Sequence, residues 1–200
     1  MKPRLKRFIL DILKKNRLLT LATIRPDGWP QATTVGYGSE GLVLYILCDA
    51  GSQKARNLKG CSKVSLTIDH DTDDMLAIKA LSMAAIAEPV TDEAEFPQIY
   101  RRIMQKYPSY KDVPMPDPAG IRCYRLLPKV ISVLDYSKGF GHTELVRVTR
   151  EDLKATAKAT RGRRTPPSRA ARAARGESDA RRPHRRSASR SARPRQSHRQ

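Results

Sequence analysis

Apolar residues recur at helical spacing near the start of the chain. These residues are Leu5, Phe8, Ile9 and Ile12, with lysines and arginines between them. The pattern predicts an amphipathic helix that packs its apolar face against the rest of the protein. Contact of its basic face with an anionic membrane is an alternative, but a solvated polar face is the simpler interpretation.

After this helix the pattern changes to short apolar or alternating segments, which predict β-strands. The expected strands are residues 19–24, 30–37, 42–47, 63–68, 76–87, 121–127 and 130–136. The turn sequence Pro26-Asp27-Gly28 favours a tight hairpin between the first two, and Pro128 separates the last two. Residues 52–58 and 92–107 return to helical spacing, and the proline-rich segment 108–118 predicts a loop.

Six or seven strands with hairpin connections and few helices indicate a mainly β protein, an antiparallel barrel with flanking helices. We expect this domain to occupy residues 1–150. Residues 151–200 are rich in arginine and contain almost no large apolar side chains. They cannot bury enough apolar surface to offset an ordering cost of about 1–2 kcal/mol per residue. A disordered basic C-terminal tail is therefore expected.

The net charge of +19 lies mostly in this tail. Residues 155–200 contain one lysine and fourteen arginines against two acidic residues, which accounts for +13 of the total. Such a tail favours non-specific contact with polyanions, including nucleic acid. Its arginine runs lack interleaved aromatic residues for base stacking. The same composition also resembles a GC-rich stretch translated in a shifted frame, in which case the tail has no selected function.

Cysteine usage and hydropathy point to a cytoplasmic protein. Cys48, Cys61 and Cys123 are odd in number and lack paired spacing, which fits a reducing compartment and argues against disulfides or a zinc site. No apolar run approaches the roughly eighteen residues of a membrane span. Charged residues interrupt the apolar stretch of the first helix, unlike a signal peptide. The acidic residues around His70 are more typical of a solvated turn than of a metal site.

The segment from Gly51 to Leu58 combines the features of an anion site. A strand ends, a glycine permits a turn, and Ser52 is a typical N-cap residue for the helix that follows. Free N–H groups at a helix start attract anions, and Lys54 and Arg56 add positive charge within one turn. Both a phosphate site and an ordinary capped surface helix fit this pattern.

This segment and its surroundings resemble the FMN-binding core of the pyridoxamine-5′-phosphate-oxidase-like superfamily. The matching parts are residues 21–23, 27–30, 44–46, 51–58 and 63–66, with weaker similarity at 85–90 and 124–128. The resemblance covers roughly residues 4–136 and implies a split β-barrel. It implies FMN as the cofactor, with a deazaflavin or haem as alternatives.

The resemblance also implies roles for particular residues. In this family the serine and lysine of the motif hold the flavin phosphate, which corresponds to Ser52 and Lys54 here, and the residue between them, Gln53, contributes. The second strand lays its backbone along the isoalloxazine, and the end of the third strand supplies further contacts. In this chain these positions are Thr33, Thr34, Val35, Leu47 and Cys48.

Two departures from the family pattern bear on the site. Many members carry an arginine at the position of Thr33, so Arg56 or Lys79 is a candidate substitute. The C-terminal substrate motif of the oxidases has no counterpart; residues 135–145 stand in its place, with Lys138 and His142 beside two glycines. One interpretation is a loop that closes over the flavin or substrate, with Lys138 as a candidate cofactor contact and His142 as a candidate proton donor. An exposed turn with incidental polar residues is the alternative.

The resemblance implies a homodimer with one FMN per subunit at the dimer interface. The expected function is that of a flavin-dependent oxidoreductase acting on a small molecule. An alternative of another class is a non-enzymatic sensor or carrier of flavin or haem, for which His142 is the first candidate haem ligand.

Overall fold

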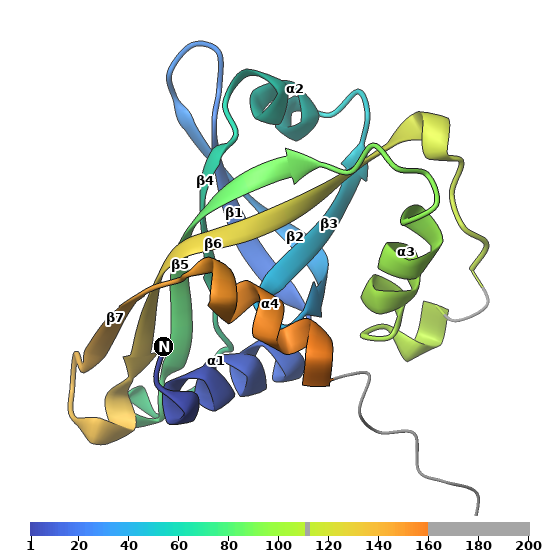
Figure 1. Ribbon diagram of the computed structural model, residues 1–200. Helices are drawn as coiled ribbons and strands as arrows, with labels where there is room; N and C mark the ends of the chain where they lie inside the picture. The colour runs from blue at the N-terminus through green and yellow to red at the C-terminus, as the bar shows by residue number, and fades with distance from the viewer. Residues whose placement is uncertain (111–112, 160–200) are drawn as a thin grey trace, which may run out of the picture. The chain divides into compact units, whose positions relative to one another are not determined.

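The computed structural model describes residues 1–110 and 113–159 (Figure 1). The strands are β1 (Leu18–Ile24), β2 (Pro30–Glu40), β3 (Val43–Asp49), β4 (Lys63–Ile68), β5 (Lys79–Pro89), β6 (Ile121–Asp135) and β7 (Thr143–Arg147). The helices are α1 (Pro3–Lys15), α2 (Gln53–Gly60), α3 (Phe96–Met104) and α4 (Arg150–Ala159). The strands form one antiparallel sheet in the order β3-β2-β1-β4-β5-β6-β7. Because β3 also pairs with β6, six strands close into a barrel. Strand β7 pairs with β6 as an additional edge strand. The predicted fold class is confirmed.

Strands β1, β2 and β3 are joined by tight hairpins, as the turn sequences predict. In the first turn, Gly28 has a φ of 85°, and in the second Gly41 has a φ of 61°. These are conformations that glycine adopts without the steric cost of a side chain. The hairpins fix the register of the first three strands, for example Thr20 opposite Thr34.

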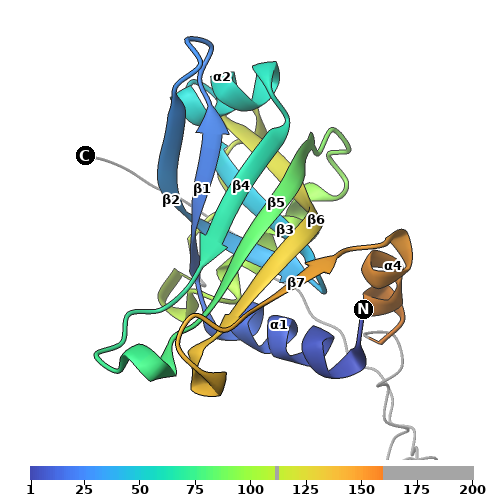
Figure 2. The ribbon, with the colours of Figure 1, turned by 90° about the vertical axis from the view of Figure 1, so that its left-hand side faces the viewer.

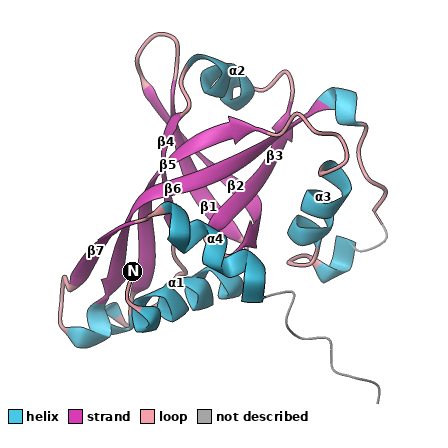
Figure 3. Cartoon of the chain, in the orientation of Figure 1, coloured by secondary structure: helices cyan, strands magenta, loops and turns pink. Residues whose placement is uncertain are grey.

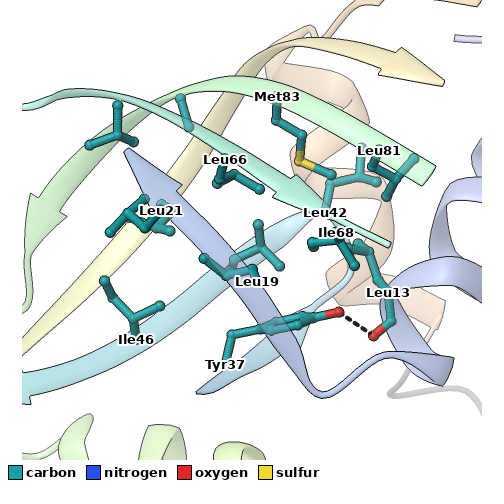
Figure 4. Close-up of a cluster of buried hydrophobic side chains, with 14 of the residues drawn as sticks. Leu13, Leu19, Leu21, Tyr37, Leu42, Ile46, Leu66, Ile68, Leu81 and Met83 are labelled. Carbon is teal, nitrogen blue, oxygen red and sulfur yellow. Dashed lines mark hydrogen bonds between the residues drawn. The ribbon is translucent and has the colours of Figure 1, made fainter. Parts of the chain in front are cut away.

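The barrel interior is filled by apolar side chains that alternate along the strands (Figure 4). Helix α1 covers one end and buries Ile9, Ile12 and Leu13 against this core, as its sequence pattern predicts. The buried Tyr37 of β2 donates its hydroxyl to the carbonyl oxygen of Leu13 at 2.9 Å. Helix α2 lies at the opposite end, and Figures 2 and 3 show the two helices separated by the length of the barrel.

The predicted break between two strands at Pro128 is wrong, because residues 121–135 form the single strand β6. The register shows why a proline is tolerated there. Ala84 lies opposite Val130 and Ala85 lies opposite Pro128, so β6 has one extra residue, Lys129, at a bulge. A bulge interrupts the ladder locally, which accommodates a residue that has no N–H to donate.

A helix crosses the predicted domain boundary at residue 150. Helix α4 continues to Ala159, and Asp152 in its first turn is only 7% exposed. The Asp152 carboxylate accepts hydrogen bonds from the backbone N–H and the hydroxyl of Thr149, both at 3.0 Å, and from the amino group of Met1 at 2.9 Å. At least the start of α4 therefore packs with the barrel domain. The remainder of the predicted tail, residues 160–200, lies outside the described residues.

None of the helices in the described ranges has both the length and the apolar character that crossing a membrane requires.

Candidate functional site

The amino-terminal end of α2 follows directly from the end of β3. Ser52 is its N-cap: the side-chain oxygen accepts a hydrogen bond from the N–H of Ala55 at 3.2 Å. The same hydroxyl donates to the carbonyl oxygen of Asp49 at 2.7 Å. The capping role that the sequence predicts for Ser52 is confirmed, and its hydroxyl proton is engaged within the turn.

Lys54 lies in the first turn of this helix. Its side chain is half-buried, and it forms no hydrogen bond or ion pair with any described residue. Burial lowers the pKa of Lys54, and the nearby Cys48 opposes this shift only partly. A partly desolvated ammonium beside the positive end of a helix favours an anion as its partner.

The other charged groups of the turn are already engaged. The guanidinium of Arg56 folds back and donates to the carbonyl oxygen of Gly51 and, at 2.8 Å, to the side-chain oxygen of Gln53. The Asp49 carboxylate accepts from the N–H of Gly51 at 2.8 Å. The N–H of Ala55 is also engaged, by the Ser52 cap. An anion at this end of α2 would therefore meet the Lys54 side chain and the N–H groups of Gln53 and Lys54, which have no acceptor within the helix.

A buried polar network anchors α2 to the first hairpin. Asn57, 1% exposed, donates from its side-chain nitrogen to Thr23 Oγ1 at 2.9 Å and to Gln31 Oε1 at 3.0 Å. Its side-chain oxygen accepts from Gln53 at 2.8 Å. The buried role of Asn57 is not among the sequence-based expectations; a polar residue beside Leu58 on the buried side of a short helix is the signal that points to it.

Replacing Asn57 by alanine should lower the free energy of unfolding by about 1–3 kcal/mol, because Thr23 and Gln31 lose a buried partner. Chemical denaturation measures this change. The matched control is Lys59→Ala, an exposed position of the same helix, for which a change within about 0.5 kcal/mol is expected. Equal effects at the two positions would show that the network does not hold the helix.

The strand positions implied for the isoalloxazine face two sides of the barrel wall. Val35 is buried inside the barrel, whereas Thr34 is exposed on its outer surface. Thr33 has a buried hydroxyl oxygen with no hydrogen-bond partner among the described residues. Cys48 packs against the barrel core, and burial raises the pKa of its thiol. A reactive thiolate at Cys48 is therefore disfavoured.

Leu47 faces outward into a hollow of about 350 Å³ between the barrel wall and the α3 region. The hollow is lined by Gly36, Leu47, Ile103, Met104, Tyr107 and Tyr110. A Cβ at Gly36 would lie 2.7 Å from the Tyr107 hydroxyl, so the close approach of Tyr107 requires glycine there. The hollow adjoins the strand that carries Thr34, on the same outer side of the wall.

The start of β5 and the connection between β6 and β7, which carry the remaining candidate residues, lie at the other end of the barrel from α2 (Figures 1 and 2). Lys79 begins β5, opposite Asp135. Lys138 pairs with Glu144 at 2.7 Å, and His142 Nε2 lies 3.6 Å from the same carboxylate. The structure therefore does not bring Lys79, Lys138 or His142 together with Lys54 within one subunit.

Residues 5–127 match the family model of pyridoxamine 5′-phosphate oxidase. The chain belongs to this family. The matched region ends within β6, so β7 and α4 lie outside it. No protein among the curated sequences matches the chain.

Several solved structures share this fold. A heme binding protein from Mycobacterium smegmatis is 20% identical with a TM-score of 0.62, over 74% of this chain and 59% of that one. A conserved hypothetical protein from Mycobacterium tuberculosis is 25% identical with a TM-score of 0.58, over 72% and 91%. A candidate pyridoxamine 5′-phosphate oxidase from Listeria innocua is 21% identical with a TM-score of 0.55, over 66% and 98%. The chain thus spans 59% of the length of the heme binding protein.

Proposed function

We propose that the protein binds FMN with its phosphate at the amino-terminal end of α2, and acts as a flavin-dependent oxidoreductase on a small molecule. The observation that carries this proposal is Lys54, a half-buried ammonium without an anionic partner in the described part of the chain. Membership of the pyridoxamine 5′-phosphate oxidase family supports a flavin as the anion that completes it.

The residues around Lys54 fit a flavin phosphate. The N–H groups of Gln53 and Lys54 have no acceptor within the helix, whereas that of Ala55 is capped by Ser52. On β2, the position where many family members carry an arginine is Thr33, whose buried hydroxyl lacks a partner among the described residues. Bound FMN would supply the redox chemistry, and the protein would bind and orient it. The outer surface near Thr34 and Leu47 would receive the ring system, since an apolar hollow adjoins it.

We propose further that a second copy of the chain completes the site. The outer face of β1, β2, β4 and β5 carries two rows of small uncharged side chains, which we call the uncharged face. One row is Thr34, Thr20, Thr67 and Ser82, and the other is Ala32, Ala22, Ser65 and Ala84. In Figure 2 this face points toward the viewer and no described helix covers it. Because Thr34 belongs to both the uncharged face and the proposed flavin site, a dimer through this face would place the cofactor at the interface.

Haem is the second candidate ligand, in a non-enzymatic binding or carrier role. A heme binding protein is among the structures that share the fold. Within this chain, the Nε2 atom of His142 is buried and makes no hydrogen bond with a described residue, although the Glu144 carboxylate lies 3.6 Å away. An imidazole nitrogen is a typical iron ligand.

Absorption spectra of the purified protein, and titrations of the apoprotein, distinguish these ligands. We expect flavin bands and FMN binding at least about ten-fold tighter than riboflavin, since the phosphate supplies charge-assisted hydrogen bonds. Equal affinity for FMN and riboflavin would remove the proposed phosphate site. A haem Soret band that disappears in His142→Ala would favour the second candidate.

A further inference from the structure

A second pocket lies beside the carboxyl-terminal part of α1. Figure 1 shows that α1 lies at the end of the barrel away from α2. The pocket has a volume of about 520 Å³ and is formed by the carboxyl-terminal part of α1, the turn between β2 and β3, and the end of α3 with the residues that follow it. Five of its lining side chains are positively charged, and none is acidic. These five are Lys14, Lys15, Arg17, Arg102 and Lys106. We call this site the basic pocket.

Only two of the five cations have an acidic partner. Lys15 pairs with Asp11 at 2.8 Å on the exposed surface of α1, and Arg102 pairs with Glu40 at 3.0 Å. The other three form no ion pair within the described ranges. The basic pocket therefore concentrates positive charge that the surrounding residues do not neutralise.

Lys106 is the innermost of these cations. Its ammonium donates to the carbonyl oxygens of Leu13 at 2.7 Å and Asn16 at 2.8 Å, and lies 3.4 Å from the centre of the Tyr37 ring. Carbonyl dipoles and an aromatic face stabilise a cation without neutralising it. Burial lowers the pKa of Lys106 to about 8. An anion in the pocket would offset this desolvation.

The carboxyl end of α1 should repel an anion, because the helix dipole is negative there. Its carbonyl groups, however, already accept hydrogen bonds. The oxygen of Leu13 accepts from both Lys106 and Tyr37, and the oxygen of Ile12 accepts from Asn16. Lys106 and the neutral donors thus offset the partial negative charge of these carbonyl groups. The side chains of Lys14 and Arg17 remain available for a ligand.

We propose that the basic pocket binds a small molecule that carries two or more linked phosphate groups. Three cations without acidic partners in the described ranges, two from the end of α1 and the residues after it and one from the residues after α3, match a multivalent anion better than a single carboxylate. The concave shape and the apolar Leu10 and Pro108 in the lining leave room for an organic group beside the phosphates. This site is distinct from the proposed flavin phosphate site, and the proposal does not depend on FMN binding.

Calorimetric titration of the full chain with inorganic pyrophosphate, ADP and inorganic phosphate tests this proposal at about 0.15 M salt, where long-range attraction is screened. We expect saturable binding at one site, with pyrophosphate or ADP tighter than phosphate. The double variant Lys14→Ala/Arg17→Ala should weaken it by about ten-fold or more. ADP tighter than pyrophosphate would show that the pocket also receives the organic group, and equal affinities that the phosphates alone are recognised; both support the proposal.

The matched control is Lys63→Ala/Lys129→Ala, which removes the same charge from exposed positions on β4 and β6. It should change pyrophosphate affinity by less than about two-fold, because surface charges at a distance are screened. Equal losses in the two double variants would mean that only overall charge attracts the anion, and the proposal fails. It also fails if pyrophosphate does not saturate, or if Lys14→Ala/Arg17→Ala loses FMN rather than pyrophosphate.

Discussion

Lys54→Ala should weaken FMN binding by about 1.5–3 kcal/mol, which corresponds to roughly ten- to a hundred-fold in the dissociation constant. The reason is that Lys54 is the one cation of the α2 turn whose charge no described residue uses. The affinity for riboflavin should hardly change, because riboflavin has no phosphate group for Lys54 to bind. Fluorescence titration of the apoprotein with both flavins measures the difference.

Two variants sharpen this result. Lys54→Arg keeps the charge and should retain most of the affinity for FMN. Lys59→Ala removes an exposed charge from the last turn of the same helix and should leave the affinity within about two-fold. Because burial lowers the pKa of Lys54, FMN affinity should also fall as the pH rises and the ammonium loses its proton. Lys54→Ala should lack this fall. An unchanged FMN affinity in Lys54→Ala would place the phosphate elsewhere.

The fold could be predicted because its signals are local. The hairpins of β1, β2 and β3 follow from turn residues such as Gly28, whose positive φ suits glycine, and from alternation along each strand. The same holds for the α2 cap at Ser52. Pro128 was misjudged because a bulge depends on the partner strand β5, which the local sequence around the proline does not reveal.

The packing of the start of α4 against the barrel could not be predicted for a related reason. The segment around Asp152 reads as charged and solvated, so its burial could not be predicted from composition. The carboxylate is buried because Thr149 and the amino group of Met1 meet it, and the second of these lies at the other end of the sequence. A local sequence pattern cannot predict contacts between residues that lie so far apart in the sequence.

The candidate site was predictable in part. The residues of the α2 turn are contiguous, so their proximity follows from the sequence, and Lys54 lies in the first turn of the helix as the motif predicts. The sequence does not show which cations lack a partner. Arg56 looks equivalent to Lys54, yet its guanidinium donates hydrogen bonds to Gly51 and Gln53. The placement of His142 at the far end of the barrel depends on the path of β6 across the sheet.

Thr20→Glu should dissociate the proposed homodimer, raising its dissociation constant by about 100-fold or more. Thr20 lies in the middle of the uncharged face, between Thr34 on one side and Thr67 on the other. In a two-fold symmetric interface the same patch meets itself, so the substitution brings two carboxylates toward one another in a region that excludes water. The fold of each subunit should persist, since Thr20 is exposed.

Sedimentation velocity over a range of concentrations measures this change, and Thr91→Glu, the same substitution at an exposed loop position, is its control. The control should sediment as the parent protein does. Because Thr34 lies on the uncharged face and at the proposed flavin site, Thr20→Glu should also weaken FMN binding, with the loss reduced at high protein concentration as dimers re-form. A parent protein that is monomeric while it holds FMN would remove the dimer proposal. A dimer that survives Thr20→Glu would place the interface on another face of the barrel.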